Sequence, residues 1–239
     1  EASFGPGKEL NALTVQLDRE GKEIILTGQI DRVDLADGNG KTYFRVIDYK
    51  SSDKDLDLDE IYYGLKLQLL VYMAVIEKNH LGEGELSPAG MFYLSAKDLM
   101  IQANTDVTDE EIQKEMIKES RMKGFVIGEE SKELYPQDIK WKHLSQFDHD
   151  VLMKYLEASI KSIGEEICGG NDEIAPYVRG GRSGCDFCPY RPVCGYDAQF
   201  MAKERELTPL KHSDAMAKIL EKTGYGKNRK KPTEEGGEH

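Results

Sequence analysis

The sequence predicts an α/β fold in which a mixed central β-sheet is flanked by helices and followed by a C-terminal cysteine-rich segment. Three observations predict it. Two runs, 23–30 and 43–47, are rich in β-branched and apolar residues, as strands are. Apolar residues recur at helical spacing over 57–76 and again over 148–167. Three of the four cysteines lie within residues 185–194.

A hairpin is predicted between the first two β-runs. Residues 37–40, Asp-Gly-Asn-Gly, separate the runs and tolerate positive φ. Pairing 23–30 with 43–47 would bring Asp31, after the first run, close to Asp48, after the second. A third strand is predicted over 88–94.

The end of the second run carries the residues that point to chemistry. Successive side chains of a strand point to opposite faces, so Asp48 and Lys50 share one face and Tyr49 points to the other. Two adjacent carboxylates stay ionised when buried only if a cation compensates them. Hard oxygen ligands favour Mg²⁺ or Mn²⁺ over zinc. Such an ion polarises a phosphoryl oxygen and activates a water, which Lys50 could orient, so these residues indicate phosphodiester hydrolysis.

The alternative is that Asp31, Asp34 and Lys50 are surface charges at strand ends, as most such residues are. The apolar residues that precede Asp48 favour a buried strand whose polar end opens into a cleft. We therefore favour the site.

The helical pattern over 57–76 begins with acidic residues, which the helix dipole favours in a first turn. Gln68 and Tyr72 are four residues apart and so lie on one face of this helix. Either they satisfy backbone groups in the core, or they face the cleft, where they would contact a phosphate or fix Lys50.

The rest of the chain is predicted to add core helices and surface segments. A capping box at 108–111 predicts a surface helix to about residue 122, and 137–141 is predicted to be a loop in which Trp141 packs. A short helix is predicted over 214–222 and disorder over 224–239. The apolar face of the 148–167 helix is assigned to the core: Val151, Leu152, Tyr155, Leu156, Ile160 and Ile163.

Residues 28–34, 47–51 and 68–72 resemble, in order and approximate spacing, the second, third and helical motifs of the RecB-like branch of the PD-(D/E)xK nucleases. The resemblance implies a restriction-endonuclease-like core and a Mg²⁺- or Mn²⁺-dependent DNase. It implies that Asp31, Asp48 and the main-chain carbonyl of Tyr49 bind the metal, and that Lys50 is catalytic. Gln68 and Tyr72 would complete the catalytic set.

The spacing of Cys185, Cys188 and Cys194 resembles the iron–sulfur staple of bacterial helicase–nucleases of the AddAB type. The resemblance implies a [4Fe–4S] cluster whose fourth ligand lies outside this chain, since no cysteine precedes Cys168, which we expect to pack as a small apolar residue. Zinc is the alternative metal, with His212 as a conceivable fourth ligand. When no cluster is bound, we expect the loop either to be mobile or to be held only by packing of Phe187, Tyr190 and Tyr196, with the thiols free or mispaired.

The same resemblance implies a place in a larger assembly. We expect a nuclease domain over 1–200, including the cysteine motif 185–194, a partly disordered tail over 201–239, and a longer protein of which this chain is a C-terminal piece. The implied function is exonuclease action in a helicase–nuclease complex that processes double-strand DNA ends for recombinational repair. A single DNA strand would be the substrate and an A-type helicase–nuclease subunit the partner. The alternatives are a catalytically silent DNA-binding or scaffold module, or a zinc-stabilised interaction domain.

Composition limits these functions. The 239 residues are 39% apolar and 32% charged, which is typical of a globular domain. The 44 acidic and 32 basic residues give a net charge of −12, which argues against strong non-specific DNA binding by the chain alone. No apolar run is long enough to span a bilayer and no signal peptide is evident, so we expect no membrane partner and a cytoplasmic location.

Overall fold

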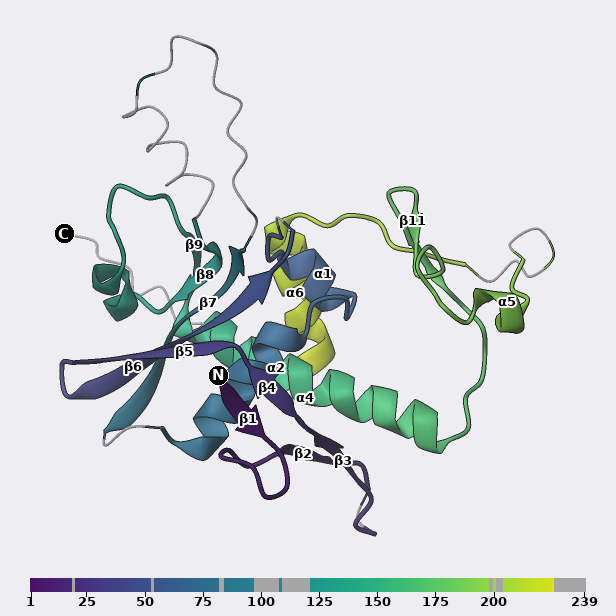
Figure 1. The fold of residues 1–239 in the computed structure, drawn as a ribbon, viewed down its shortest axis with the longest axis horizontal. Helices are drawn as coiled ribbons and strands as arrows, with labels where there is room; N and C mark the ends of the chain where they lie inside the picture. The colour runs from purple at the N-terminus through teal and green to yellow at the C-terminus, as the bar shows by residue number, and fades with distance from the viewer. Residues whose placement is uncertain are drawn as a thin grey trace, which may run out of the picture.

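A five-stranded mixed sheet forms the centre of the molecule (Figure 1). The computed structural model describes residues 1–18, 20–52, 54–81, 84–96, 108, 121–197, 200 and 204–225. The sheet consists, in spatial order, of β5 (Arg32–Gly38), β6 (Lys41–Lys50), β7 (Glu85–Ser95), β8 (Lys123–Ile127) and β9 (Lys142–Leu144). The pairs β6–β7 and β8–β9 are parallel and the other two pairs are antiparallel. The predicted mixed sheet flanked by helices is confirmed.

Helices cover one face of this sheet and build the main core. They are α1 (Leu58–Tyr62), α2 (Gln68–Asn79), α4 (Gln146–Cys168) and α6 (His212–Thr223). A smaller apolar cluster on the opposite face joins β6, β7 and β8 to Tyr135, which follows the 3₁₀ helix η1 (Glu130–Leu134). No helix in the described part of the chain is long and apolar enough to cross a membrane.

The alternation of side chains along β6 leads the main core directly into the polar residues at its end. Phe44 and Val46 are fully buried in the main core, while Ile47 belongs to the cluster on the other face. Because side chains alternate, Asp48 and Lys50 continue the row of Phe44 and Val46 on the helix-covered face. The strand thus carries a carboxylate and an ammonium group to the edge of the core.

The predicted turn exists, but the predicted pairing of 23–30 with 43–47 is wrong. Asn39 (φ 52°) and Gly40 (φ 74°) form a tight turn that joins β5 to β6, so the residues next to the turn pair with each other. The earlier run divides into β3 (Glu23–Leu26), which pairs with β2 (Leu13–Gln16), and β4 (Gly28–Ile30), which pairs with β1 (Ala2–Phe4). An apolar run predicts a strand but does not specify its partner.

The single helix predicted over 57–76 is also wrong, because α1 ends at Tyr62 and Gly64 terminates it. Gly64 adopts a left-handed conformation (φ 76°), and its N–H donates to the carbonyl of Ile61 at 2.9 Å. The N–H of Leu65 donates to the carbonyl of Glu60 at 2.8 Å, which completes a Schellman motif. The chain then starts a new helix, α2, at Gln68.

The other predicted elements have mixed outcomes. The third strand, the long helix and the short C-terminal helix are confirmed as β7, α4 and α6, and Trp141 packs on Phe92 and Tyr135. Ile163 is 50% exposed rather than in the core, because the last turns of α4 extend away from the sheet (Figure 1). Residues 109–120, expected to be helical, and 226–239, expected to be disordered, lie outside the described residues.

A C-terminal segment with small elements of its own extends from the body of the molecule (Figure 1). It contains β10 (Tyr177–Arg179), β11 (Arg182–Ser183), the single-turn α5 (Arg191–Cys194) and β12 (Arg205–Glu206), with β10 between β11 and β12. Arg179 ties this segment to α1. Its guanidinium forms an ion pair with the buried carboxylate of Asp59 and lies 3.2 Å from Glu60 Oε1.

We expect Arg179→Ala to destabilise the protein by roughly 2–3 kcal/mol, because it leaves the Asp59 carboxylate buried without its main cation. Urea unfolding would measure the loss, and limited proteolysis would show faster cleavage within 170–205. Arg182→Ala is the matched control, since Arg182 lies opposite Arg179 in the β10–β11 pair but is exposed. Equal stability of the two variants would show that the ion pairs of Arg179 with Asp59 and Glu60 do not hold the C-terminal segment to α1.

Candidate active site

The structure brings Asp31 and Asp48 together at the end of β6. Asp48 lies near the end of the helix-covered row of that strand and is only 2% exposed. Asp31 lies between β4 and β5, and its Oδ2 accepts a hydrogen bond from the main-chain N–H of Tyr49 at 2.8 Å. This bond fixes the Asp31 carboxylate beside the peptide that follows Asp48. The side chain of Tyr49 is 42% exposed, as expected for the opposite face.

Lys50 connects the strand to α2. Its Nζ lies 2.5 Å from Asp48 Oδ2 and donates a hydrogen bond to Gln68 Oε1 at 2.9 Å. Gln68 in turn donates from Nε2 to the hydroxyl of Tyr72 at 2.7 Å. Direct contacts therefore join four of the side chains proposed from the sequence, Asp48, Lys50, Gln68 and Tyr72. Asp31 is linked to them through the main-chain N–H of Tyr49.

The electrostatics of the group are those of a partly compensated buried carboxylate. Burial raises the pKa of Asp48 above its usual value, the ammonium group of Lys50 opposes this effect, and the negative charge of Asp31 adds to it. Burial also raises the pKa of the Tyr72 hydroxyl, and the charges of Asp48 and Asp31 raise it further. The charges of both carboxylates therefore act on the Tyr72 hydroxyl.

These residues fit a bound Mg²⁺ or Mn²⁺. Within the described part of the chain, Asp48 Oδ2 is buried and no hydrogen bond to it is found, although it forms an ion pair with Lys50 Nζ at 2.5 Å. A single ion pair leaves this buried oxygen with coordination to spare, and a divalent cation would supply a further partner. The described residues contain no group of three or more His, Cys, Asp or Glu side chains that would cage a metal. Mg²⁺ does not require such a cage, since it keeps several waters and binds through one or two carboxylates.

Among the described residues, the side chains of the cysteine motif are not gathered into a metal-binding group. The four cysteines are free thiols, and Cys194 is exposed at the end of α5. His212 and the cysteines form no metal-binding group among the described residues, and the His212 ring packs on Phe125 instead. The zinc site with His212 is therefore not found in this part of the chain.

The structure does not show the expected packing of Cys168 or of two of the three rings near the cysteines. Phe187 is 98% exposed and Tyr190 is 72% exposed, so neither ring holds the loop. Cys168 is exposed at the last turn of α4 and does not pack as a small apolar residue. A segment this short, extended away from the sheet, has too little surrounding chain to bury such side chains.

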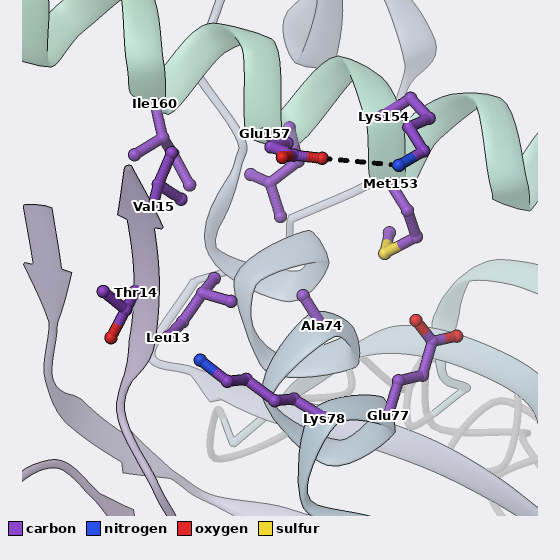
Figure 2. A pocket seen from close by; sticks show the side chains of 11 residues that line it. Leu13, Thr14, Val15, Ala74, Glu77, Lys78, Met153, Lys154, Glu157 and Ile160 are labelled. Carbon is purple, nitrogen blue, oxygen red and sulfur yellow. Dashed lines mark ion pairs between the residues drawn. The ribbon is translucent and has the colours of Figure 1, made fainter. Parts of the chain in front are cut away.

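A separate pocket of about 380 Å³ lies between β2, α2 and α4 (Figure 2). Leu13 and Val15 reach it from the strand, Ala74 from α2 and Ile160 from α4, and an ion pair between Lys154 and Glu157 crosses its rim at 3.5 Å. None of the residues proposed for the active site lines this pocket. It is therefore distinct from the site at the end of β6.

Tyr93, which was not predicted as a site residue, lies on β7 directly beside Asp48. Its ring is almost fully buried, and burial together with the charges of Asp48, Glu60 and Tyr72 raises its pKa to about 12. The signal was present in the third predicted strand, where Met91 and Tyr93 alternate onto one face. The parallel register between β6 and β7 places Tyr93 at the site, and this register cannot be read from the sequence.

Comparison with known proteins agrees with this architecture. The family model of the PD-(D/E)XK nuclease superfamily matches residues 1–195, and the chain belongs to that superfamily. It is 36% identical over 225 residues to the B-type subunit of the ATP-dependent helicase/deoxyribonuclease of Caldanaerobacter subterraneus subsp. tengcongensis. It is 35% identical over 221 residues to the protein of the same name from Thermoanaerobacter sp. and 36% identical over 230 residues to that from Bacillus mycoides. These matches cover 84–85% of this chain but 19–20% of each relative, so the chain spans about a fifth of their length.

We expect Asp48→Asn to abolish stabilisation of the protein by Mg²⁺ without lowering its stability in metal-free buffer. The amide keeps the shape of the carboxylate but removes the buried charge, so the loss of the Lys50 ion pair is offset by a smaller desolvation cost. Thermal unfolding with and without Mg²⁺ measures both effects. Asp37→Asn, at the far end of the hairpin, is the control and should keep the Mg²⁺ effect. An Asp48→Asn variant that Mg²⁺ stabilises as it does the wild type would exclude this metal site.

Proposed function

We propose that this chain is a deoxyribonuclease domain that hydrolyses DNA phosphodiester bonds with Mg²⁺ or Mn²⁺. The observation that carries the proposal is the Asp48 carboxylate, which is buried beside Asp31 and Lys50 and has one oxygen for which no hydrogen bond is found among the described residues. Membership of a nuclease superfamily supports the same chemistry.

Each residue has a distinct role in this proposal. Asp31, Asp48 and the main-chain carbonyl of Tyr49 hold the metal, which when bound polarises the scissile phosphate and lowers the pKa of a water. Lys50, in contact with Asp48, stabilises negative charge that develops on the phosphate or orients the attacking water. Gln68 keeps the Lys50 ammonium in place through its Oε1, and Tyr72 orients the Gln68 amide.

We also propose that the domain acts as an exonuclease within a helicase–nuclease complex that processes double-strand DNA ends for recombinational repair. The names of the relatives, each the B-type subunit of a helicase/deoxyribonuclease, support this setting. They support an A-type subunit as the partner. The net charge of −12 disfavours DNA binding by this chain alone. Other parts of such a complex therefore deliver a single strand to the site.

Asp48→Ala and Lys50→Ala are expected to reduce Mg²⁺-dependent cleavage of single-stranded DNA by about 10²-fold or more, because each removes transition-state stabilisation. The assay uses the protein as the cell makes it, with any subunit that co-purifies. Lys41→Ala, at the opposite end of β6, is the matched control and should keep wild-type rates. If both site variants cleave DNA at the wild-type rate, the cleavage comes from another part of the assayed protein. This chain would then be a catalytically silent DNA-binding or scaffold module.

We further propose that Cys185, Cys188 and Cys194 ligate a [4Fe–4S] cluster with a fourth ligand from outside this chain. Their spacing supports the proposal, although the loop as it stands does not gather three metal-binding side chains among the described residues. Closing the loop around a cluster therefore needs a ligand that ties it to another part of a protein.

The expected result is iron and acid-labile sulfide in equal amounts in the native protein, with a visible absorbance that Cys188→Ala abolishes. This chain produced alone should contain neither. Cys168→Ala is the control and should leave the iron content of the native protein unchanged. Stoichiometric zinc in place of iron would instead support the zinc-stabilised interaction domain.

A further inference from the structure

Tyr93 lies next to Asp48 across the parallel pair of β6 and β7. It follows Met91 on the helix-covered face of β7, as Asp48 follows Val46 on β6, so the two rows run side by side out of the core. Tyr93 is 4% exposed, and its position is therefore fixed by packing.

The ring of Tyr93 contacts Lys50. The ammonium Nζ of Lys50 lies 5.4 Å from the ring centroid, within the range of a cation–π interaction. Lysine carries its charge on a flexible four-carbon stem, so one contact does not fix the position of the ammonium group. Here three neighbours surround it: the Asp48 carboxylate at 2.5 Å, the Gln68 Oε1 at 2.9 Å and the Tyr93 ring.

We propose that Tyr93 is a positioning residue of the nuclease site, whose aromatic ring holds the Lys50 ammonium group against the scissile phosphate. This inference rests on the proposed function, because it assigns Tyr93 a role only through Lys50. Asp48 and Gln68 contact the ammonium group within hydrogen-bonding distance, and the ring limits its remaining freedom. Within the described part of the chain no hydrogen bond of the Tyr93 hydroxyl is observed, so the ring, and not the hydroxyl, is the group that acts.

The test compares Tyr93→Leu, which removes the ring, with Tyr93→Phe, which keeps it. In the native protein with Mg²⁺ and a single-stranded DNA substrate, we expect Tyr93→Leu to lower kcat about tenfold with KM unchanged. Tyr93→Phe should restore kcat to within about twofold of the wild type. Both variants should keep the increase in melting temperature that Mg²⁺ produces, because the metal-binding carboxylates are intact.

Phe125→Leu is the matched control. Phe125 lies on β8 of the same sheet, is fully buried and has the Lys142 ammonium 5.8 Å from its ring centroid, away from the site. It should lower the melting temperature and leave kcat unchanged. An equal loss of kcat in Phe125→Leu and Tyr93→Leu would overturn the proposal, because it would show a general effect of lost packing.

The Lys50→Ala variant distinguishes failure of the role of Tyr93 from failure of the proposed function. If Lys50→Ala is inactive and Tyr93→Leu has wild-type kcat, the role of Tyr93 is overturned while the proposed function stands. If Tyr93→Phe is as slow as Tyr93→Leu, the hydroxyl acts and the proposal for the ring is overturned. If Lys50→Ala cleaves DNA at the wild-type rate, the proposed function fails, and the role of Tyr93 fails with it.

Discussion

Asp48 imposes the constraint on which the site depends, because a carboxylate buried to this degree is costly unless its charge is compensated. The alternation of β6 makes the burial unavoidable, since the row that carries Phe44 and Val46 into the core leads to this residue. Lys50, two residues further along the same row, supplies one opposite charge. Within the described residues this ion pair is the only charge compensation found at Asp48 Oδ2, so a bound cation would add to it. Local rules of stability are most often broken at functional sites, and this carboxylate is such a place.

The break between α1 and α2 determines how Lys50 is held. Had the helix continued through Gly64, Gln68 would have followed the direction set by α1. Because a Schellman motif ends α1, α2 starts afresh at Gln68 and packs along β6 and β7. Gln68 and Tyr72 then lie on the helix face that meets the strand ends, where Gln68 bonds Lys50. The turn at Gly64 interrupts the predicted helix, and it places Gln68, the first residue of α2, at the site.

The sequence predicted the features that depend on local periodicity. The two-residue repeat of a strand placed Asp48 and Lys50 on one face, and the four-residue spacing of a helix joined Gln68 to Tyr72. It did not predict features that depend on partners distant in the chain. Strand pairing of 23–30, the strands β8 and β9, and the neighbourhood of Tyr93 are set by tertiary register, which an apolar pattern does not encode. The stop at Gly64 was visible as a glycine, but its left-handed conformation was not.

The acidic residues around α1 show how the chain treats carboxylates that have only a structural role. Lys142 contacts Asp55 and Asp57 at 2.8 and 2.7 Å, and Arg179 forms ion pairs with both Asp59 and Glu60. Each of these four acids has a cation from another element, and the contacts tie β9 and β10 to the α1 region. Asp48 is more deeply buried than any of them, yet its Oδ2 accepts no hydrogen bond within the described part of the chain. Asp59, the buried acid of this group, has both oxygens paired, one with the main-chain N–H of Glu60 and one with Arg179. By contrast, a buried acid with an oxygen for which no hydrogen bond is found among the described residues indicates a ligand rather than a structural contact.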